Sequence, residues 1–148
     1  MRRIEESILI DAPREIAWGV FIDLTCWADW NSVLTGVRAA TDTTLAGGDG
    51  FSCRLQPFGF PIPFAVHVEI VEAPARLLWV AGRWGVRGRH WFLFADQEGG
   101  TRCDSVEDLT GPTVALCGPL FPTWRFRGLT RRFLQDLKSG AERRAAGG

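Results

Sequence analysis

Tyrosine is absent from this chain, and histidine occurs only twice in 148 residues. The absence of a phenol excludes mechanisms that rely on a tyrosine hydroxyl, and two imidazoles leave a small acid–base repertoire. Close clusters of metal ligands are also absent, because the four cysteines are scattered and form no C-x-x-C pair. We therefore expect no metal and four reduced thiols. The chain has no P-loop or G-x-G-x-x-G motif, so no cofactor is expected.

An excess of charge of one sign is lacking too, since 17 Lys and Arg residues balance 17 Asp and Glu residues. A neutral chain does not favour nucleic acid as a partner. No apolar run approaches the roughly 20 residues of a membrane span, and residues 1–6 lack the apolar core of a signal peptide. We expect a cytoplasmic protein with a single domain over residues 1–146.

Aromatic residues are abundant, with seven Trp and ten Phe, and the apolar pattern places them on regular elements. Two short helices are expected after the first strand, one starting at an Asp11 N-cap and one over residues 26–30. A long C-terminal helix carries an apolar stripe of Phe126, Leu129, Phe133 and Leu137. Alternation of apolar and polar residues predicts an α+β fold with an antiparallel sheet, whose strands cover about residues 6–11, 33–38, 51–55, 64–70, 77–81, 88–95 and 101–109.

The segment from Gln97 to Gly100 has the composition of a tight hairpin turn. If these two residues pair, antiparallel partners have numbers that sum to 197. One face of the hairpin then carries three cross-strand pairs, namely His90 with Glu107, Phe92 with Ser105, and Phe94 with Cys103.

A set of short motifs is distributed along almost the whole chain. They are Ile10-Asp11-Ala12-Pro13, Trp18, Trp30-Asn31, Val68, Pro74, Gly88 with His90 and Phe92, Thr101-Arg102, and Glu107 with Gly111. In this order the chain resembles the START/Bet v 1-like (SRPBCC) superfamily, particularly its polyketide cyclase/dehydrase-like branch. The resemblance implies a helix-grip fold, in which a curved seven-stranded antiparallel sheet wraps around the C-terminal helix and two short helices close one end. It also implies a cavity for an apolar ligand, but no particular reaction.

Our leading hypothesis is a protein that binds a small hydrophobic or aromatic ligand, lipid- or polyketide-like, between the sheet and the last helix. His90 and Glu107 supply polarity. Trp27 and Asn31 either rim the mouth or form a buried helix corner. The remaining lining is expected to consist of Phe64, Val66, Val68, Phe92, Phe94, Phe126, Leu129 and Phe133.

Two other functions stay open. The first is a cyclase or dehydratase that uses His90 as its acid–base group, oriented by Glu107. The same pair also has a purely structural interpretation, as a hydrogen bond between two buried polar groups. The second function is an interaction module in which arginines of the C-terminal helix or of the hairpin around Trp84 contact a partner. A homodimer is left open.

Overall fold

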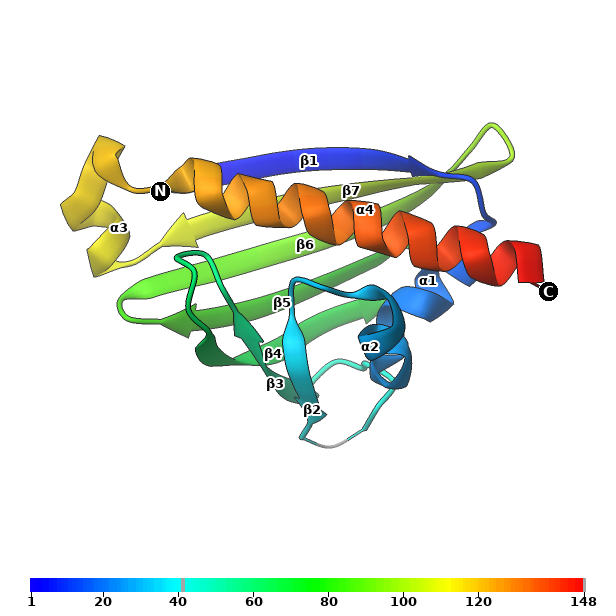
Figure 1. Ribbon diagram of the computed structural model, residues 1–148, viewed down its shortest axis with the longest axis horizontal. Coiled ribbons are helices and arrows are strands. Elements are labelled where there is room, and N and C mark those ends of the chain that lie inside the picture. Colours follow the sequence, from blue (N-terminus) through cyan, green and yellow to red (C-terminus); the bar gives the residue numbers. More distant parts are fainter. Residues whose placement is uncertain (41, 148) are drawn as a thin grey trace.

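The computed structural model describes residues 1–40 and 42–147, which form one curved sheet with a long helix across it (Figure 1). The helical elements are α1 (Arg14–Ile22), the 3-10 turn η1 (Leu24–Cys26), α2 (Trp27–Trp30), α3 (Pro112–Cys117), the 3-10 turn η2 (Gly118–Leu120) and α4 (Thr123–Gly147). The strands are β1 (Arg2–Ile10), β2 (Thr35–Ala39), β3 (Gly50–Leu55), β4 (Ile62–Glu72), β5 (Arg76–Arg83), β6 (Val86–Gln97) and β7 (Gly100–Thr110).

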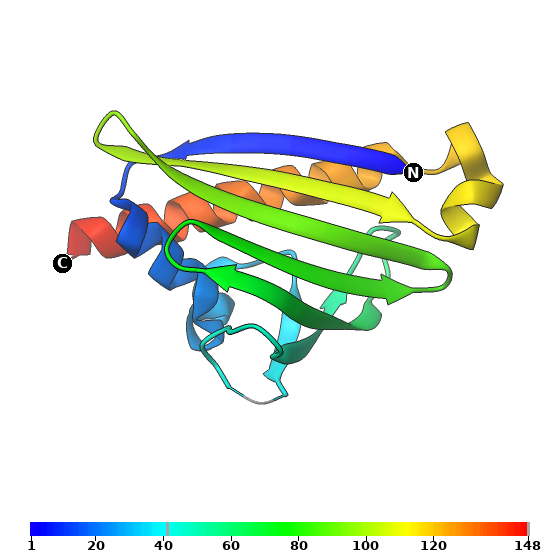
Figure 2. The ribbon, with the colours of Figure 1, turned by 180° about the vertical axis from the view of Figure 1, so that it is seen from behind.

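The sheet is antiparallel throughout, in the order β1-β7-β6-β5-β4-β3-β2. Figure 1 shows α4 crossing one face of the sheet, and Figure 2 shows the sheet in front of this helix from the opposite side. The predicted helix-grip architecture is confirmed. Both ends of several strands extend beyond the predicted ranges, because the apolar pattern marks the buried centre of a strand better than its exposed ends.

The predicted β6–β7 hairpin register is also confirmed. Gln97 pairs with Gly100, and His90 lies opposite Glu107. Glu98 and Gly99, the two residues between the strands, have φ values of 48° and 80°. Left-handed conformations at both central positions match the right-handed twist of the flanking strands, which fixes the register.

The start of α1 differs from the prediction. Pro13, not Asp11, occupies the N-cap position, and it makes no side-chain capping bond. The backbone N–H of Asp11 instead donates to Glu142 of α4, with a distance of 2.9 Å from N to Oε2. Lys138 also donates to this carboxylate, and together these hydrogen bonds lower the pKa of Glu142. The end of β1 is therefore attached to the C-terminal part of α4.

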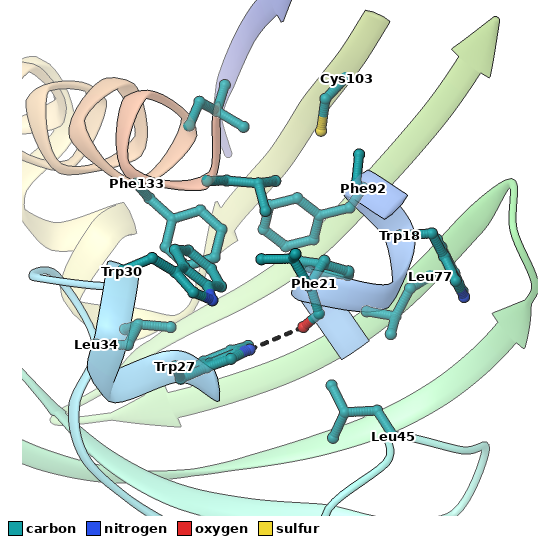
Figure 3. Close-up of a cluster of buried hydrophobic side chains, with 14 of the residues drawn as sticks. Trp18, Phe21, Trp27, Trp30, Leu34, Leu45, Leu77, Phe92, Cys103 and Phe133 are labelled. Carbon is teal, nitrogen blue, oxygen red and sulfur yellow. Dashed lines mark hydrogen bonds between the residues drawn. The ribbon is translucent and has the colours of Figure 1, made fainter. Parts of the chain in front are cut away.

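A cluster of aromatic side chains joins α1, α2, the sheet and α4 at one end of the molecule (Figure 3). Phe21 lies at its centre and is fully buried, with a centroid distance of 4.8 Å to Phe92. The indole Nε1 of Trp27 donates to the Phe21 carbonyl at 2.8 Å. We call this group the aromatic cluster, and it comprises Trp18, Phe21, Trp27, Trp30, Phe51, Trp79, Phe92, Phe94 and Phe133.

The apolar stripe of α4 faces the sheet, but its two halves differ in packing. Phe133 and Leu137 are buried, whereas Phe126 and Leu129 are only partly buried. On the outer side of the helix, Arg131 donates to Glu6 of β1, with 2.7 Å between Nε and Oε1. In the part of the chain that the structure describes, every helix is too short or too polar to cross a bilayer.

At Gly140, α4 lies very close to α2. A Cβ atom on Gly140 would lie 2.8 Å from Cβ of Trp30, whereas a Cβ atom on Gly128 of the same helix would meet nothing within 4 Å. Replacing glycine by alanine inside a helix normally stabilises it by about 0.5–1 kcal/mol.

We expect Gly128→Ala to raise the free energy of unfolding by about that amount, and Gly140→Ala to lower it because the helices must move apart. Urea denaturation of the two variants measures both changes. Stabilisation by Gly140→Ala would contradict the packing of α4 on α2.

Candidate ligand-binding pocket

A pocket of about 310 Å³ lies between the sheet and the N-terminal half of α4. The aromatic cluster closes it on one side, and residues of α3, of the segment after η2 and of the β3–β4 and β5–β6 turns border its other side. Its walls are largely apolar. Among the residues that form them are Ile62, Phe64 and Val66 of β4, Phe92 of β6, Leu109 of β7, and Phe126, Leu129 and Phe133 of α4.

Small residues on adjacent strands explain why this half of the fold stays open. Ala81 of β5 pairs with Gly88 of β6, and both border the pocket. Further along the same two strands, Trp79 pairs with His90 and Leu77 with Phe92. The large side chains fill the space beneath α4 in one half, whereas methyl and hydrogen substituents leave it empty in the other.

Gly88 also makes room for Glu107. Among the described residues, Glu107 is the one whose carboxylate borders the pocket. A Cβ atom on Gly88 would lie 2.9 Å from Glu107 Oε2. The side chain of Glu107 is 17% exposed and that of His90 is 11% exposed. Nδ1 of His90 lies 3.3 Å from Glu107 Oε2. The pair therefore lies together in a mostly apolar wall, as the hairpin register predicted.

Ser105 is a third member of this group. Its Oγ lies 2.6 Å from His90 Nε2, so both ring nitrogens have protein partners. With the proton on Nδ1, facing the carboxylate, the Ser105 hydroxyl donates to Nε2. The imidazole also stacks on Phe92, with 4.1 Å between ring centroids. Hydrogen bonds and stacking together fix the ring orientation.

This arrangement has the order of a Ser–His–Glu triad, but its geometry does not allow nucleophilic catalysis by serine. Ser105 is fully buried and does not border the pocket. A nucleophile must reach the substrate carbon, so Ser105 can only position His90. The hairpin register places Ser105 opposite Phe92 and does not reveal its contact with His90. That contact is diagonal across the two strands, and a diagonal contact depends on side-chain rotamers as well as on register.

Two residues predicted to line the pocket lie elsewhere. Phe94 contacts Trp18 and Phe21 within the aromatic cluster, and Val68 is fully buried. Both are on the predicted face of the sheet, but α1 and its aromatic side chains cover that part of the face. The other predicted lining residues border the pocket, namely Phe64, Val66, Phe92, Phe126, Leu129 and Phe133.

The structure corrects the rim position considered for Trp27 and Asn31. Trp27 is 1% exposed and belongs to the aromatic cluster. Asn31 Oδ1 accepts from the backbone N–H groups of Val33 and Leu34, at 3.0 and 2.9 Å. Both residues are therefore used to turn the chain and to anchor α2, which is the alternative that the sequence also allowed.

The mouth of the pocket is built from residues that no periodic pattern identifies. Phe58 comes from the β3–β4 turn, Trp84 from the β5–β6 turn, and Cys117 and Phe121 from the region of α3 and η2. Cys117 is a free, partly buried thiol.

Cys53, a buried residue of β3, is also free, and burial raises its pKa to about 12. The Cys53 thiol is consequently unreactive near neutral pH.

Comparison with known proteins identifies one family model that covers almost the whole chain. Residues 1–142 match the family model described as "Polyketide cyclase / dehydrase and lipid transport". No curated protein is a significant sequence match.

Solved structures share the fold at low sequence identity. A Thermus thermophilus protein is 14% identical with a TM-score of 0.78, over 95% of this chain and 97% of that one. Ara h 8.0201 is 6% identical with a TM-score of 0.74, over 99% of both chains. DynU16, from the dynemicin biosynthetic locus, is 18% identical with a TM-score of 0.69, over 93% of this chain and 46% of that one.

The two leucines Leu129 and Leu137 of α4 test the contrast between the open and packed halves. Leu137 is fully buried in the packed core, so we expect Leu137→Ala to cost about 2–5 kcal/mol of unfolding free energy. Leu129 borders space that is already empty, and we expect Leu129→Ala to cost clearly less than Leu137→Ala. Urea denaturation measures both losses, and equal losses would contradict the position of the pocket.

Proposed function

The chain belongs to the polyketide cyclase/dehydrase and lipid transport family, and we propose that it binds a compact hydrophobic ligand with one polar end in the pocket beneath α4. The observation that carries this proposal is the combination of an apolar pocket with a single carboxylate in its wall. Such a combination is typical of small-molecule sites, where apolar walls provide affinity and a few polar groups orient the ligand.

The size of the pocket supports a small ligand. Its volume of about 310 Å³ lies at the lower end of the range of about 300–1,000 Å³ found for ligand pockets. Aromatic side chains supply much of the wall, including Phe64, Phe92 and Phe126. These features favour a fused or substituted aromatic compound over a long acyl chain.

The chemistry of the wall indicates what the polar end of the ligand carries. Glu107 Oε2 faces His90, and both nitrogens of His90 are already engaged by Glu107 and Ser105. The carboxylate therefore offers its remaining acceptor capacity to the pocket. A ligand hydroxyl, phenol or protonated amine that donates to Glu107 fits this arrangement, whereas a second carboxylate would be repelled.

An occlusion experiment tests whether the pocket is the binding site. We expect native mass spectrometry or a titration with the apolar dye ANS to detect saturable binding to the unmodified protein. Leu129→Trp should weaken this binding at least about tenfold because the indole fills the pocket. Leu9→Trp, on an exposed position of β1, is the control and should leave binding unchanged. Equal binding by both variants would contradict the proposal.

A pair of probe ligands tests the role of Glu107. 1-Naphthol and naphthalene differ by one hydroxyl group, and a hydrogen bond to a charged group contributes about 1.5–3 kcal/mol. We expect the protein to bind 1-naphthol at least about tenfold more tightly than naphthalene. Glu107→Gln should reduce this preference without changing the affinity for naphthalene. Fluorescence titration measures both constants, and an unchanged preference would exclude Glu107 as the polar anchor.

The His90–Glu107 pair favours a second candidate function, cyclisation or dehydration of a polyketide-type carbonyl compound. Because both nitrogens of His90 have protein partners, Glu107 is the member of the pair that can exchange a proton with a ligand, and His90 orients it. In that case Glu107→Gln should lower turnover by about 10²–10⁴-fold, while the affinity for a ligand without a hydroxyl group persists. Screening small aromatic polyketide precursors by mass spectrometry separates the two functions, because a carrier has no turnover to lose.

A further inference from the structure

Large apolar side chains are exposed around the mouth of the pocket. Leu116 is 90% exposed, Leu120 88% and Trp124 68%. Trp84 is 58% exposed. With two phenylalanines of the β3–β4 turn they form a group that we call the mouth surface, consisting of Phe58, Phe60, Trp84, Leu116, Leu120 and Trp124.

The aromatic members of the mouth surface come from three separate segments, and a chain of contacts through Arg125 joins them. Phe60 lies between Phe58 and Trp84, with centroid distances of 6.4 and 6.3 Å. The guanidinium of Arg125 lies over the rings of both Phe58 and Trp124. Figure 1 shows α3 at the same end of the molecule as the β5–β6 turn, and Thr113 of α3 donates to the carbonyl of Trp84.

Positive charge accompanies these side chains. The segments that form the mouth surface lie within residues 50–68, 73–95 and 109–135, which contain no Asp or Glu. Arg83, Arg87 and Arg125 are exposed in this region. Glu107 lies within the pocket wall and Asp108 is paired with Arg3, so the exposed charge contributed by these segments is positive.

The backbone conformation of Trp84 is one that tryptophan does not favour. Trp84 has a φ of 54°, and Gly85 follows with a φ of 74°. Turns with two left-handed residues favour Asn, Asp or Gly at the first position, whereas a bulky residue there is strained. Trp84 contacts Phe60 and Arg83 at the rim of the pocket but belongs to neither buried cluster, so core packing does not account for a strained tryptophan at this position.

We propose that the mouth surface docks the protein onto a bilayer that contains anionic lipid. Tryptophan is enriched at the membrane–water interface, leucine and phenylalanine partition into the acyl boundary, and arginines attract anionic headgroups. A second copy of this chain fits less well, because two electropositive ends would face each other. Docking places the pocket mouth against the lipid. The proposal does not depend on the proposed ligand.

Co-sedimentation with vesicles tests the docking directly. We expect the protein to bind vesicles of phosphatidylcholine mixed with phosphatidylglycerol, and to bind vesicles of phosphatidylcholine alone less. Binding should weaken as the salt concentration rises from about 0.01 M to about 0.15 M, because the Debye length falls from about 30 Å to about 8 Å. Equal binding to both vesicle types would show that attraction between the arginines and anionic lipid does not contribute to docking.

Matched variants locate the surface. The double variant Leu116→Ser/Leu120→Ser should lower the vesicle partition coefficient at least about tenfold, because two exposed leucines no longer enter the bilayer. Leu9→Ser, an exposed leucine on β1, is the control and should have no effect. Arg87→Gln should weaken binding about fivefold, whereas Arg38→Gln on β2 should not.

A spectroscopic readout separates insertion from surface adsorption. Brominated lipids should quench part of the tryptophan emission of the unmodified protein, and Trp124→Phe should reduce this quenching while binding persists. Circular dichroism confirms that each variant is folded. The proposal is overturned if anionic vesicles do not bind the protein or if the leucine double variant binds as well as the control. It is also overturned if size-exclusion chromatography shows a dimer that the double variant abolishes.

Discussion

The distance between α4 and the sheet is set by the rings stacked between them, and the rest of the structure depends on this spacing. Phe92 of the sheet contacts Phe133 of α4 directly, with 5.5 Å between ring centroids, and Phe21 packs against both rings. Because packed aromatic rings are almost incompressible, they hold the helix away from the sheet at one end. At the other end the facing strands carry Ala81 and Gly88, which are too small to fill the same gap. The pocket is the volume that remains because α4 is held away from the sheet while the side chains beneath it are small.

The sequence predicted the elements and the hairpin register well because both follow from local rules. Gln97 and Gly100 bracket a two-residue turn, and the pairing of His90 with Glu107 follows from it. The position of the pocket along the sheet could not be predicted in the same way. Phe92 and Phe94 share a face of β6, yet only Phe92 borders the pocket. Periodicity identifies the face of a strand, whereas the depth to which that face is filled depends on residues from distant parts of the chain.

The same limit explains why the sequence missed Ser105 and the residues of the mouth. Ser105 reaches His90 diagonally, and Phe58 and Trp84 belong to turns in which no period exists. For Trp27 the sequence left two positions open. An aromatic residue beside a short helix is compatible with a rim and with a core, and only its contacts with Phe51 and the Phe21 carbonyl decide between them.

The uneven support of α4 has a consequence for motion. Its C-terminal half is attached by Asp136, which accepts from Ser32, and by Glu142, which accepts from Asp11. Its first turns border the pocket, and their contacts include the stacking of Phe126 on Phe121 and the pairing of surface arginines with Glu6. The free energy of local opening therefore increases along the helix toward its C-terminus. Local opening of the first turns of α4 would connect the pocket with solvent while leaving the aromatic cluster intact.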